Sequence, residues 1–296
     1  MSNFRAPWLG LMLLLLLGGW PARLLSAEPF FFIQLSDPQM GMFSGDQDVA
    51  QDAANFEFVV KAVNRLKPAF VVVTGDLVNK PGDVGQIATY HRIVRQIDPS
   101  IPVYNVAGNH DVQNVPTPAS LANYGKNFGA DHFVFSHQGF VGIVLNSTVI
   151  HSPNQVSGQL VEQEAWLRAE LARARAAQAR PIVVFQHHPW FIADAVEPDQ
   201  YFNIPLARRA TYLAIFREYG IRYLFCGHYH RNAEGRDGEL VNITTGPVGK
   251  PLGGAKSGMR VAIVRDEIID HRFYELGDLP VKIDLSPVPA KKTPTQ

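Results

Sequence analysis

Five short apolar segments, each followed at once by a small polar loop, constrain the fold of this 296-residue chain more than any other feature. The segments have the length of buried β-strands, and longer segments with the 3.6-residue period of helices lie between most of them. This alternation is typical of an α/β fold rather than of a helix bundle or a β-sandwich. The expected strands cover residues 30–35, 70–73, 103–106, 182–185 and 223–226.

The polar loops after these strands carry residue types that bind metals and transfer protons. In open α/β sheets the carboxyl ends of parallel strands lie at one edge, where ligands bind. If the five strands share one sheet, their loops converge on a single site. The loops are Ser36-Asp37-Pro38-Gln39, Thr74-Gly75-Asp76, Gly108-Asn109-His110-Asp111, Gln186-His187-His188-Pro189 and Gly227-His228-Tyr229-His230.

Each loop on its own has a simpler interpretation. Gly75-Asp76 is more often a turn than a ligand pair, Asn109-His110-Asp111 could be a polar loop, and His228 and His230 could lie on the surface. Independent turns have no reason, however, to supply two carboxylates, an amide beside a histidine, a further histidine and a His-x-His pair in this order. We therefore expect one functional site.

Together the loops resemble the sequence blocks of the calcineurin-like metallophosphoesterases, which run Asp-x-His, Gly-Asp, Gly-Asn-His-Asp/Glu, His and Gly-His-x-His. A closer resemblance, to the mammalian protein-phosphatase-like branch of that family, includes Tyr201-Phe202-Asn203 and His271-Arg272-Phe273-Tyr274. The resemblance implies a four-layer αββα sandwich with a dinuclear metal site at the strand carboxyl ends. The implied metal ligands are Asp37, Gln39, Asp76, Asn109, His187, His228 and His230, with Asp76 shared by both ions.

The resemblance also implies the chemistry. Two divalent ions, Mn, Fe or Zn, would activate a hydroxide that attacks a phosphate ester, and mixed oxygen and nitrogen donors suit these metals. His110 would be the general acid that protonates the leaving oxygen. Lys80, Asn79 and Arg231 are the candidate substrate contacts. The segment 190–205 could form a lid over the metals or an ordinary crossover loop.

Two positions depart from the family pattern. Most members have histidine where this chain has Gln39, and a neutral amide oxygen is a weaker, harder ligand than imidazole, so the first metal site could favour Mn or Mg. Serine/threonine protein phosphatases have Asp-Arg at the positions of Asn79 and Lys80, where the Asp orients the catalytic histidine and the Arg binds phosphate. Lys80 could attract phosphate without the two-pronged geometry of arginine.

The first 27 residues are typical of an export signal. Arg5 precedes an apolar run over 8–17, and Leu25-Ser26-Ala27 is a plausible cleavage site. We expect an exported protein, periplasmic or extracellular, with one domain over 28–284, a disordered tail over 285–296 and no stable membrane anchor after cleavage. The alternative is an uncleaved anchor, although the run falls short of the roughly 20 residues that span a bilayer.

The composition limits which kinds of partner the protein could bind. Loss of Arg5 and Arg23 with the leader leaves 25 basic against 27 acidic residues, so we expect no binding of nucleic acid. The single cysteine, Cys226, excludes internal disulfides.

The predicted substrate is a phosphate monoester, on a phosphoprotein or a small molecule. A phosphodiesterase or nucleotidase could use the same cage, since metals recognise only the phosphoryl group. A non-catalytic binding module is the third hypothesis, which His110 and the ligand blocks oppose.

Overall fold

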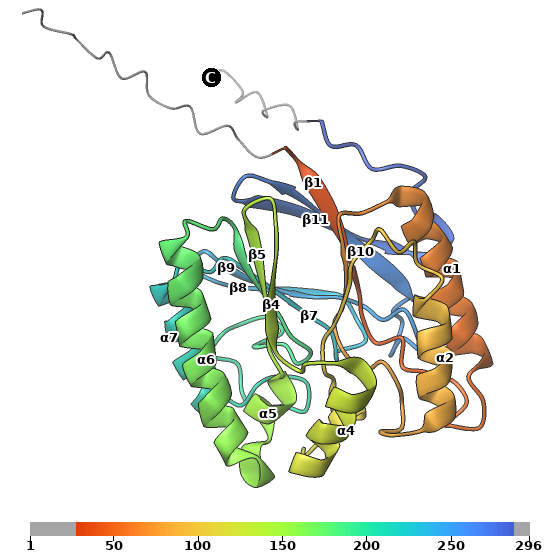
Figure 1. The fold of residues 1–296 in the computed structure, drawn as a ribbon, viewed down its shortest axis with the longest axis horizontal. Coiled ribbons are helices and arrows are strands. Elements are labelled where there is room, and N and C mark those ends of the chain that lie inside the picture. Colours follow the sequence, from red (N-terminus) through yellow and green to blue (C-terminus); the bar gives the residue numbers. More distant parts are fainter. Residues whose placement is uncertain (1–27, 287–296) are drawn as a thin grey trace, which may run out of the picture.

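The computed structural model describes residues 28–286, which form two facing β-sheets with helices on both outer sides (Figure 1). The strand order is β11-β10-β1-β2-β3 in the first sheet and β4-β5-β6-β7-β9-β8 in the second. The predicted α/β class and αββα layering are confirmed. The five loop-bearing strands divide between the two sheets of this sandwich, with β1, β2 and β3 in the first and β6 and β7 in the second. The predicted leader, 1–27, and residues 287–296 of the predicted tail lie outside the described residues.

The bounds of the elements follow the apolar runs closely. The strands are β1 (Phe30–Leu35), β2 (Val71–Val73), β3 (Val103–Asn105), β4 (Phe133–His137), β5 (Phe140–Val144), β6 (Ile182–Phe185), β7 (Tyr223–Cys226), β8 (Ala233–Asp237), β9 (Leu240–Thr244), β10 (Gly258–Arg265) and β11 (Ile268–Glu275). The α-helices are α1 (Ala50–Leu66), α2 (Val84–Val94), α3 (Asn109–Val112), α4 (Pro118–Phe128), α5 (Ser147–His151), α6 (Ser157–Ala176) and α7 (Leu206–Glu218).

The central strands β1 and β2 of the first sheet are buried on both faces. β1, β2 and β3 run parallel, and β10 pairs antiparallel with β1. Along β1, Ile33 and Leu35 belong to the apolar cluster under α1 and α2, whereas Phe30 and Phe32 belong to the cluster between the two sheets. The alternation follows from the two-residue period of a strand, and burial of both faces explains why β1 is apolar throughout.

An aromatic layer fills the space between the sheets. The ring of Phe32 stacks on that of Phe70 at 5.1 Å between centroids and meets the edge of Phe225, from the second sheet, at 5.3 Å. Phe140 and Phe185 complete this layer. The packed rings fix the two sheets against each other, so the loops at their carboxyl ends are held at one edge of the molecule.

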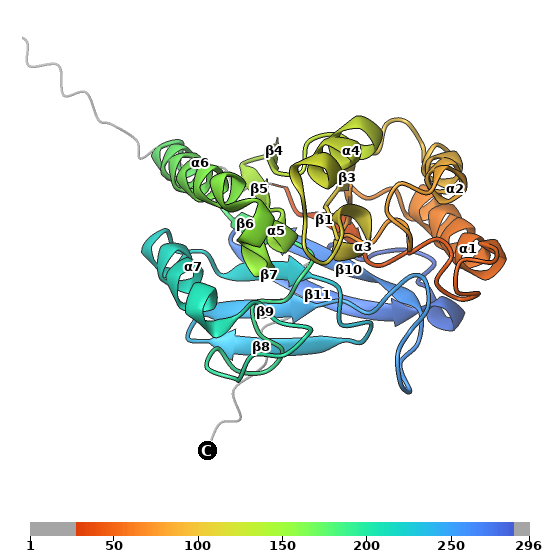
Figure 2. The ribbon, with the colours of Figure 1, turned by 90° about the horizontal axis from the view of Figure 1, so that it is seen from below.

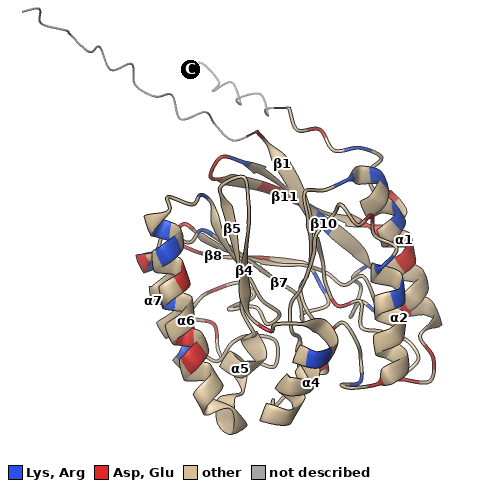
Figure 3. Cartoon of the chain, viewed as in Figure 1, with Lys and Arg blue, Asp and Glu red and all other residues tan. Residues whose placement is uncertain are grey.

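The outer face of the second sheet is covered by α6 and α7. Leu167 and Leu171 of α6 are buried there, while Leu160 is partly buried. The outward faces of α6 and α1 carry charges of both signs (Figure 3). Within residues 28–286, no helix has the length and apolar character needed to cross a bilayer.

Candidate metal centre

The loops after β1, β2 and β3 meet those after β6 and β7 at the carboxyl edge of the two sheets (Figure 2). Backbone hydrogen bonds hold neighbouring loops together. Asp37 N donates to Gly75 O at 3.1 Å and Gln39 N donates to Asp76 O at 2.8 Å. The predicted convergence is therefore achieved across two sheets rather than along one.

Most of the predicted ligands have a left-handed backbone, which is uncommon for residues other than glycine. Such conformations cost about 1–3 kcal/mol each and concentrate at functional sites, where the surrounding structure enforces them. The residues and their φ angles are Asp37 at 47°, Gln39 at 37°, Asp76 at 51°, His228 at 64° and His230 at 54°.

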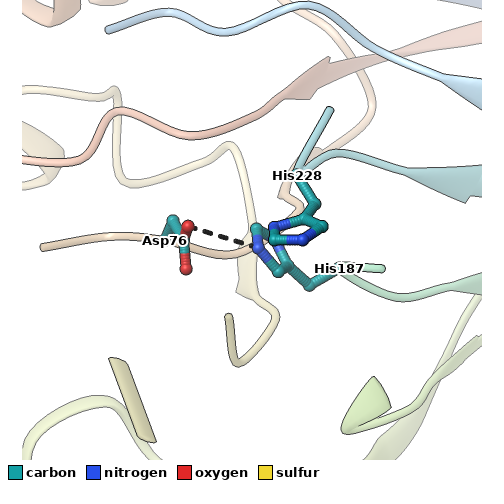
Figure 4. Close-up of side chains that lie close together, drawn as sticks. All are labelled: Asp76, His187 and His228. Atoms are coloured by element: carbon teal, nitrogen blue, oxygen red, sulfur yellow. Dashed lines mark ion pairs between the residues drawn. The ribbon is translucent and has the colours of Figure 1, made fainter. Parts of the chain in front are cut away.

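Two buried groups of side chains could each hold a metal ion. The first joins Asp37, Asp76 and His230, and the second joins Asp76, His187 and His228. In each group the potential ligand atoms lie within 4.8 Å of one another, and Asp76 is common to both. Figure 4 shows the second group, in which His187 Nε2 lies 3.3 Å from Asp76 Oδ2.

A backbone carbonyl orients each of the three histidines. Because a carbonyl only accepts, the ring nitrogen beside it must carry a proton, and in the neutral ring the other nitrogen has the lone pair that could bind a cation. This arrangement is the usual second layer of support around a metal-binding histidine. The contacts are His187 Nδ1 to Thr74 O at 2.8 Å, His230 Nδ1 to Lys250 O at 2.6 Å and His228 Nε2 to Tyr201 O at 3.2 Å.

The two amide side chains complete the donor set. Asn109 Nδ2 donates to Asn114 Oδ1 at 2.8 Å, which leaves Asn109 Oδ1 3.0 Å from His187 Nε2. Gln39 Oε1 is buried and has no hydrogen-bond partner among the described residues. A buried acceptor without a partner costs about 1–3 kcal/mol, a penalty that coordination of a cation would remove. The residues present therefore fit a pair of divalent ions.

The charges in the metal-free centre are strongly coupled. Burial alone raises the pKa of Asp37, but the imidazole of His230 outweighs it and holds that pKa below its ordinary value. Burial lowers the pKa of His187, yet Asp76 more than reverses this and raises it to about 9. Burial and His187 together lower the pKa of His228 to about 3. A proton thus occupies a position that a cation would take, and metal uptake should release it.

His110 lies at the edge of this centre and is partly exposed. Its backbone N–H donates to Asp76 Oδ1 at 2.8 Å, and its Nδ1 lies 2.7 Å from the carbonyl oxygen of Asn79. The Asn79 carbonyl therefore orients the His110 ring. The amide of Asn79 instead contacts Gln39 and Asp46.

The other two candidate substrate contacts lie on the rim. Lys80 is exposed beside Asn79. The Arg231 guanidinium carbon lies 4.8 Å from the centroid of the Tyr229 ring, and Arg231 Nη1 donates to the Tyr229 hydroxyl at 3.3 Å. Arg231 is therefore held by an aromatic neighbour rather than by an acidic one.

Asp111 is a structural residue of the centre to which the sequence assigns no role. Its buried carboxylate accepts hydrogen bonds from the backbone N–H groups of Leu77, Val78 and Gly108, at 2.9, 3.2 and 2.8 Å. Asp111 thereby ties the loop after β2 to the loop after β3. The sequence feature that could have identified Asp111 is its position as the last residue of the block Gly108-Asn109-His110-Asp111.

The segment 190–205 is a packed crossover loop rather than a separate lid. Trp190 and Phe191 lie in the core beside α7. The buried Arg209 donates to the carbonyl oxygens of Ile204, Ala195 and Glu197 at 2.8–3.0 Å. These contacts fix the loop, which places the 55% exposed Tyr201 beside the centre, its hydroxyl 3.5 Å from Asn109 Nδ2.

Comparison with known proteins agrees with this geometry. The family model described as calcineurin-like phosphoesterase matches residues 32–232. The chain is 37% identical over 269 residues to serine/threonine-protein phosphatase CPPED1 of Bos taurus, with 86% of each chain covered. It is 32% identical over 192 residues to a probable cyclic nucleotide phosphodiesterase of Rhodopseudomonas palustris, covering 62% of this chain and 65% of that one.

The fold is also found in solved structures. The purple acid phosphatase PPD1 from yellow lupin superposes with a TM-score of 0.66 at 12% identity, covering 86% of this chain and 52% of that one. The sequence motifs, the buried Asp and His groups and the family model all identify the same relationship. The chain belongs to the calcineurin-like phosphoesterase family.

Proposed function

We propose that this protein is an exported phosphomonoesterase that uses two divalent cations and acts on a phosphoprotein or a small phosphate ester. The observation that carries the proposal is the pair of buried ligand groups that share Asp76. Gln39 Oε1 and Asn109 Oδ1 would add one amide oxygen to each group. The name of the bovine relative, a serine/threonine-protein phosphatase, supports a monoester substrate.

The chain's own residues have two tasks in this reaction, to hold the cations and to supply a proton. Two bound cations would supply Lewis acidity, lowering the pKa of a water nucleophile and neutralising charge on the phosphoryl oxygens. The carboxylate of Asp76 would be a ligand of both ions. His110, held through Nδ1 by the Asn79 carbonyl, would give a proton to the leaving oxygen as the phosphorus–oxygen bond breaks. The oxygen of water ends on phosphorus.

Hydrolysis of two chromogenic substrates tests the proposal. Protein beginning at residue 28 should hydrolyse p-nitrophenyl phosphate with Mn, and hydrolyse bis-p-nitrophenyl phosphate much more slowly. Asp76→Asn should abolish turnover, because one oxygen of the shared carboxylate becomes an amide nitrogen that cannot bind a cation. Asp270→Asn, on exposed β11, is the matched control and should be active. Absence of hydrolysis of both substrates with Mn, Fe or Zn would favour a non-catalytic binding module.

A phosphodiesterase is the second candidate, and the Rhodopseudomonas palustris relative is the observation in its favour. The same cage would bind a diester, because the cations contact only the phosphoryl group. Faster hydrolysis of the diester than of the monoester would select this candidate. A panel of phosphoserine peptide, sugar phosphates and nucleotides would then identify the leaving group.

Export is a separate part of the proposal and rests on the leader over residues 1–27. Expression of the full chain in a bacterial host should place the protein in the periplasm or the medium. Its mass should correspond to a chain that starts at Glu28. Retention in the cytoplasm with an intact leader would contradict export and leave the enzymatic proposal unaffected.

A further inference from the structure

The orientation of the Gln39 side-chain amide decides whether it can bind a cation. Gln39 Nε2 donates to Asn79 Oδ1 at 3.0 Å, and Gln39 Oε1 is the buried atom left without a partner. If the amide turned over, its NH2 group would occupy the place of the oxygen. An NH2 group only donates hydrogen bonds and cannot ligate a metal. Whatever fixes this orientation therefore controls the first metal site.

The orientation of Gln39 is fixed by Asn79, and that of Asn79 by Asp46. Asn79 Nδ2 donates to Asp46 Oδ1 at 2.8 Å. An ionised carboxylate only accepts, so Asn79 must present its NH2 group to Asp46 and its oxygen to Gln39. Gln39 must in turn present its own NH2 group to Asn79. The acceptor at Asp46 thus sets the direction of both amides.

Gln86 shows independently that an acceptor is required at Asp46. Gln86 Oε1 accepts from the backbone N–H groups of Asn79 and Lys80, at 3.0 and 2.8 Å. Backbone N–H groups only donate, so this amide cannot turn over. Its Nε2 consequently points to Asp46 Oδ1, at 2.7 Å. The same loop carries the Asn79 carbonyl that holds His110.

We infer that Asp46 is a positioning residue that, through Asn79, turns the amide oxygen of Gln39 toward the first cation. Asp46 is exposed and lies between β1 and α1, outside all five sequence blocks. The inference rests on the proposed two-metal function. The Asp46 carboxylate lies on the surface and reaches the ligand Gln39 only through Asn79. It would nevertheless control the affinity for one of the two ions.

Two substitutions at this position separate the acceptor from the charge. Asp46→Ala removes both, whereas Asp46→Asn removes the charge and keeps an oxygen that can accept from Asn79 and Gln86. Titration calorimetry of metal-free protein with Mn should show two binding events. In Asp46→Ala the affinity of the weaker event should fall about tenfold, the lower end of the range for losing a residue that supports a metal ligand. Asp46→Asn should remain within about twofold of wild type.

A second measurement needs no metal. The side-chain NH2 resonances of Gln39 and Asn79, assigned by nuclear magnetic resonance in metal-free protein, should shift or broaden in Asp46→Ala and be retained in Asp46→Asn. Asp48→Ala is the matched control, because Asp48 lies in the same loop and, within residues 28–286, its carboxylate accepts only from the local Ala50 N–H, at 2.9 Å. It should leave both measurements unchanged.

Three results would overturn the inference. Wild-type affinity for both Mn ions in Asp46→Ala would show that Gln39 needs no such support. Equal weakening in Asp46→Asn and Asp46→Ala would show that charge, rather than the acceptor, is responsible. Failure of the wild-type protein to bind two Mn ions would refute the proposed metal centre itself, and the inference with it.

Discussion

Gly108→Ala provides a steric test of the metal centre. Gly108 precedes the ligand Asn109 and has φ of −102° and ψ of 171°, which any residue can adopt. The substitution therefore introduces no conformational strain. A methyl carbon at this position would lie 2.2 Å from both the backbone nitrogen and Oδ1 of Asp76. The shared carboxylate would have to move away.

The size of that movement predicts the effect. Non-bonded heavy atoms separate at about 3.5 Å, so the carboxylate oxygen, at 2.2 Å from the added methyl carbon, must retreat by about 1.3 Å. Metal sites tolerate about 0.2 Å in ligand distance, and Asp76 serves both ions. We expect Mn affinity to fall by at least about 100-fold, the upper end of the range seen when residues that support a metal ligand are lost. The metal-free protein should lose about 1–3 kcal/mol of unfolding free energy through overpacking.

Gly125→Ala is the matched control, because no described atom lies within 4 Å of the added methyl group. In α4 this change should stabilise the protein by about 0.5–1 kcal/mol and leave metal binding intact. Titration calorimetry measures Mn affinity, and urea denaturation with chelator measures stability. A folded Gly108→Ala protein that binds two Mn ions with wild-type affinity would refute the proposed position of Asp76.

Three further changes test other parts of the structure. His110→Ala should keep both Mn ions and lower kcat on an alkyl phosphate by about 10²- to 10⁴-fold in steady-state kinetics; unchanged turnover would remove His110 from the mechanism. Burial and Arg260 lower the pKa of His271 to about 4, so the native state loses stability as pH falls from about 6.5 towards 4. Between pH 7.5 and pH 5, the wild-type protein should lose about 2 kcal/mol of unfolding free energy through this histidine, as measured by urea denaturation. His271→Asn keeps an acceptor for Arg260 and should not show this loss. Equal losses in the two proteins would contradict the assignment. Phe32→Ala should destabilise the protein by about 3–5 kcal/mol in the same assay, whereas Phe58→Ala, at a half-exposed ring, should have little effect; equal effects would contradict the inter-sheet core.

The individual strands could be predicted from their apolar runs, but which strand belongs to which of the two sheets could not. Segment 30–35 forms β1 with the predicted bounds, because its residues are buried on both faces and read as one apolar run. Segment 182–185, in the other sheet, has the same character. An apolar run reports that a strand is buried and says nothing of which strand lies beside it. The sheet boundary depends on the aromatic packing around Phe32, which only the three-dimensional structure shows.

Two elements were missed because they bury few apolar residues. In helix α4 only Ser120 and Tyr124 are fully buried, so the sequence offers no apolar run there, although Thr117 before Pro118 is a start signal for a helix. In β8 the only buried residue is Gly235. β8 forms because β9 offers it a backbone partner, and pairing of this kind leaves no apolar pattern in the sequence.

The ligands were recognisable for a reason that the geometry explains. Three of the blocks place glycine directly before a predicted ligand, and each glycine abuts a ligand side chain of a different loop. A methyl group on Gly75 would lie 2.4 Å from His187 Nδ1, and one on Gly227 would lie 2.6 Å from Asp37 Oδ2. The glycines therefore record contacts between loops, across the two sheets in both cases. Asp46 lies outside these blocks and contacts Asn79 and Gln86 through its side chain, so none of the three glycine-ligand pairs identifies it.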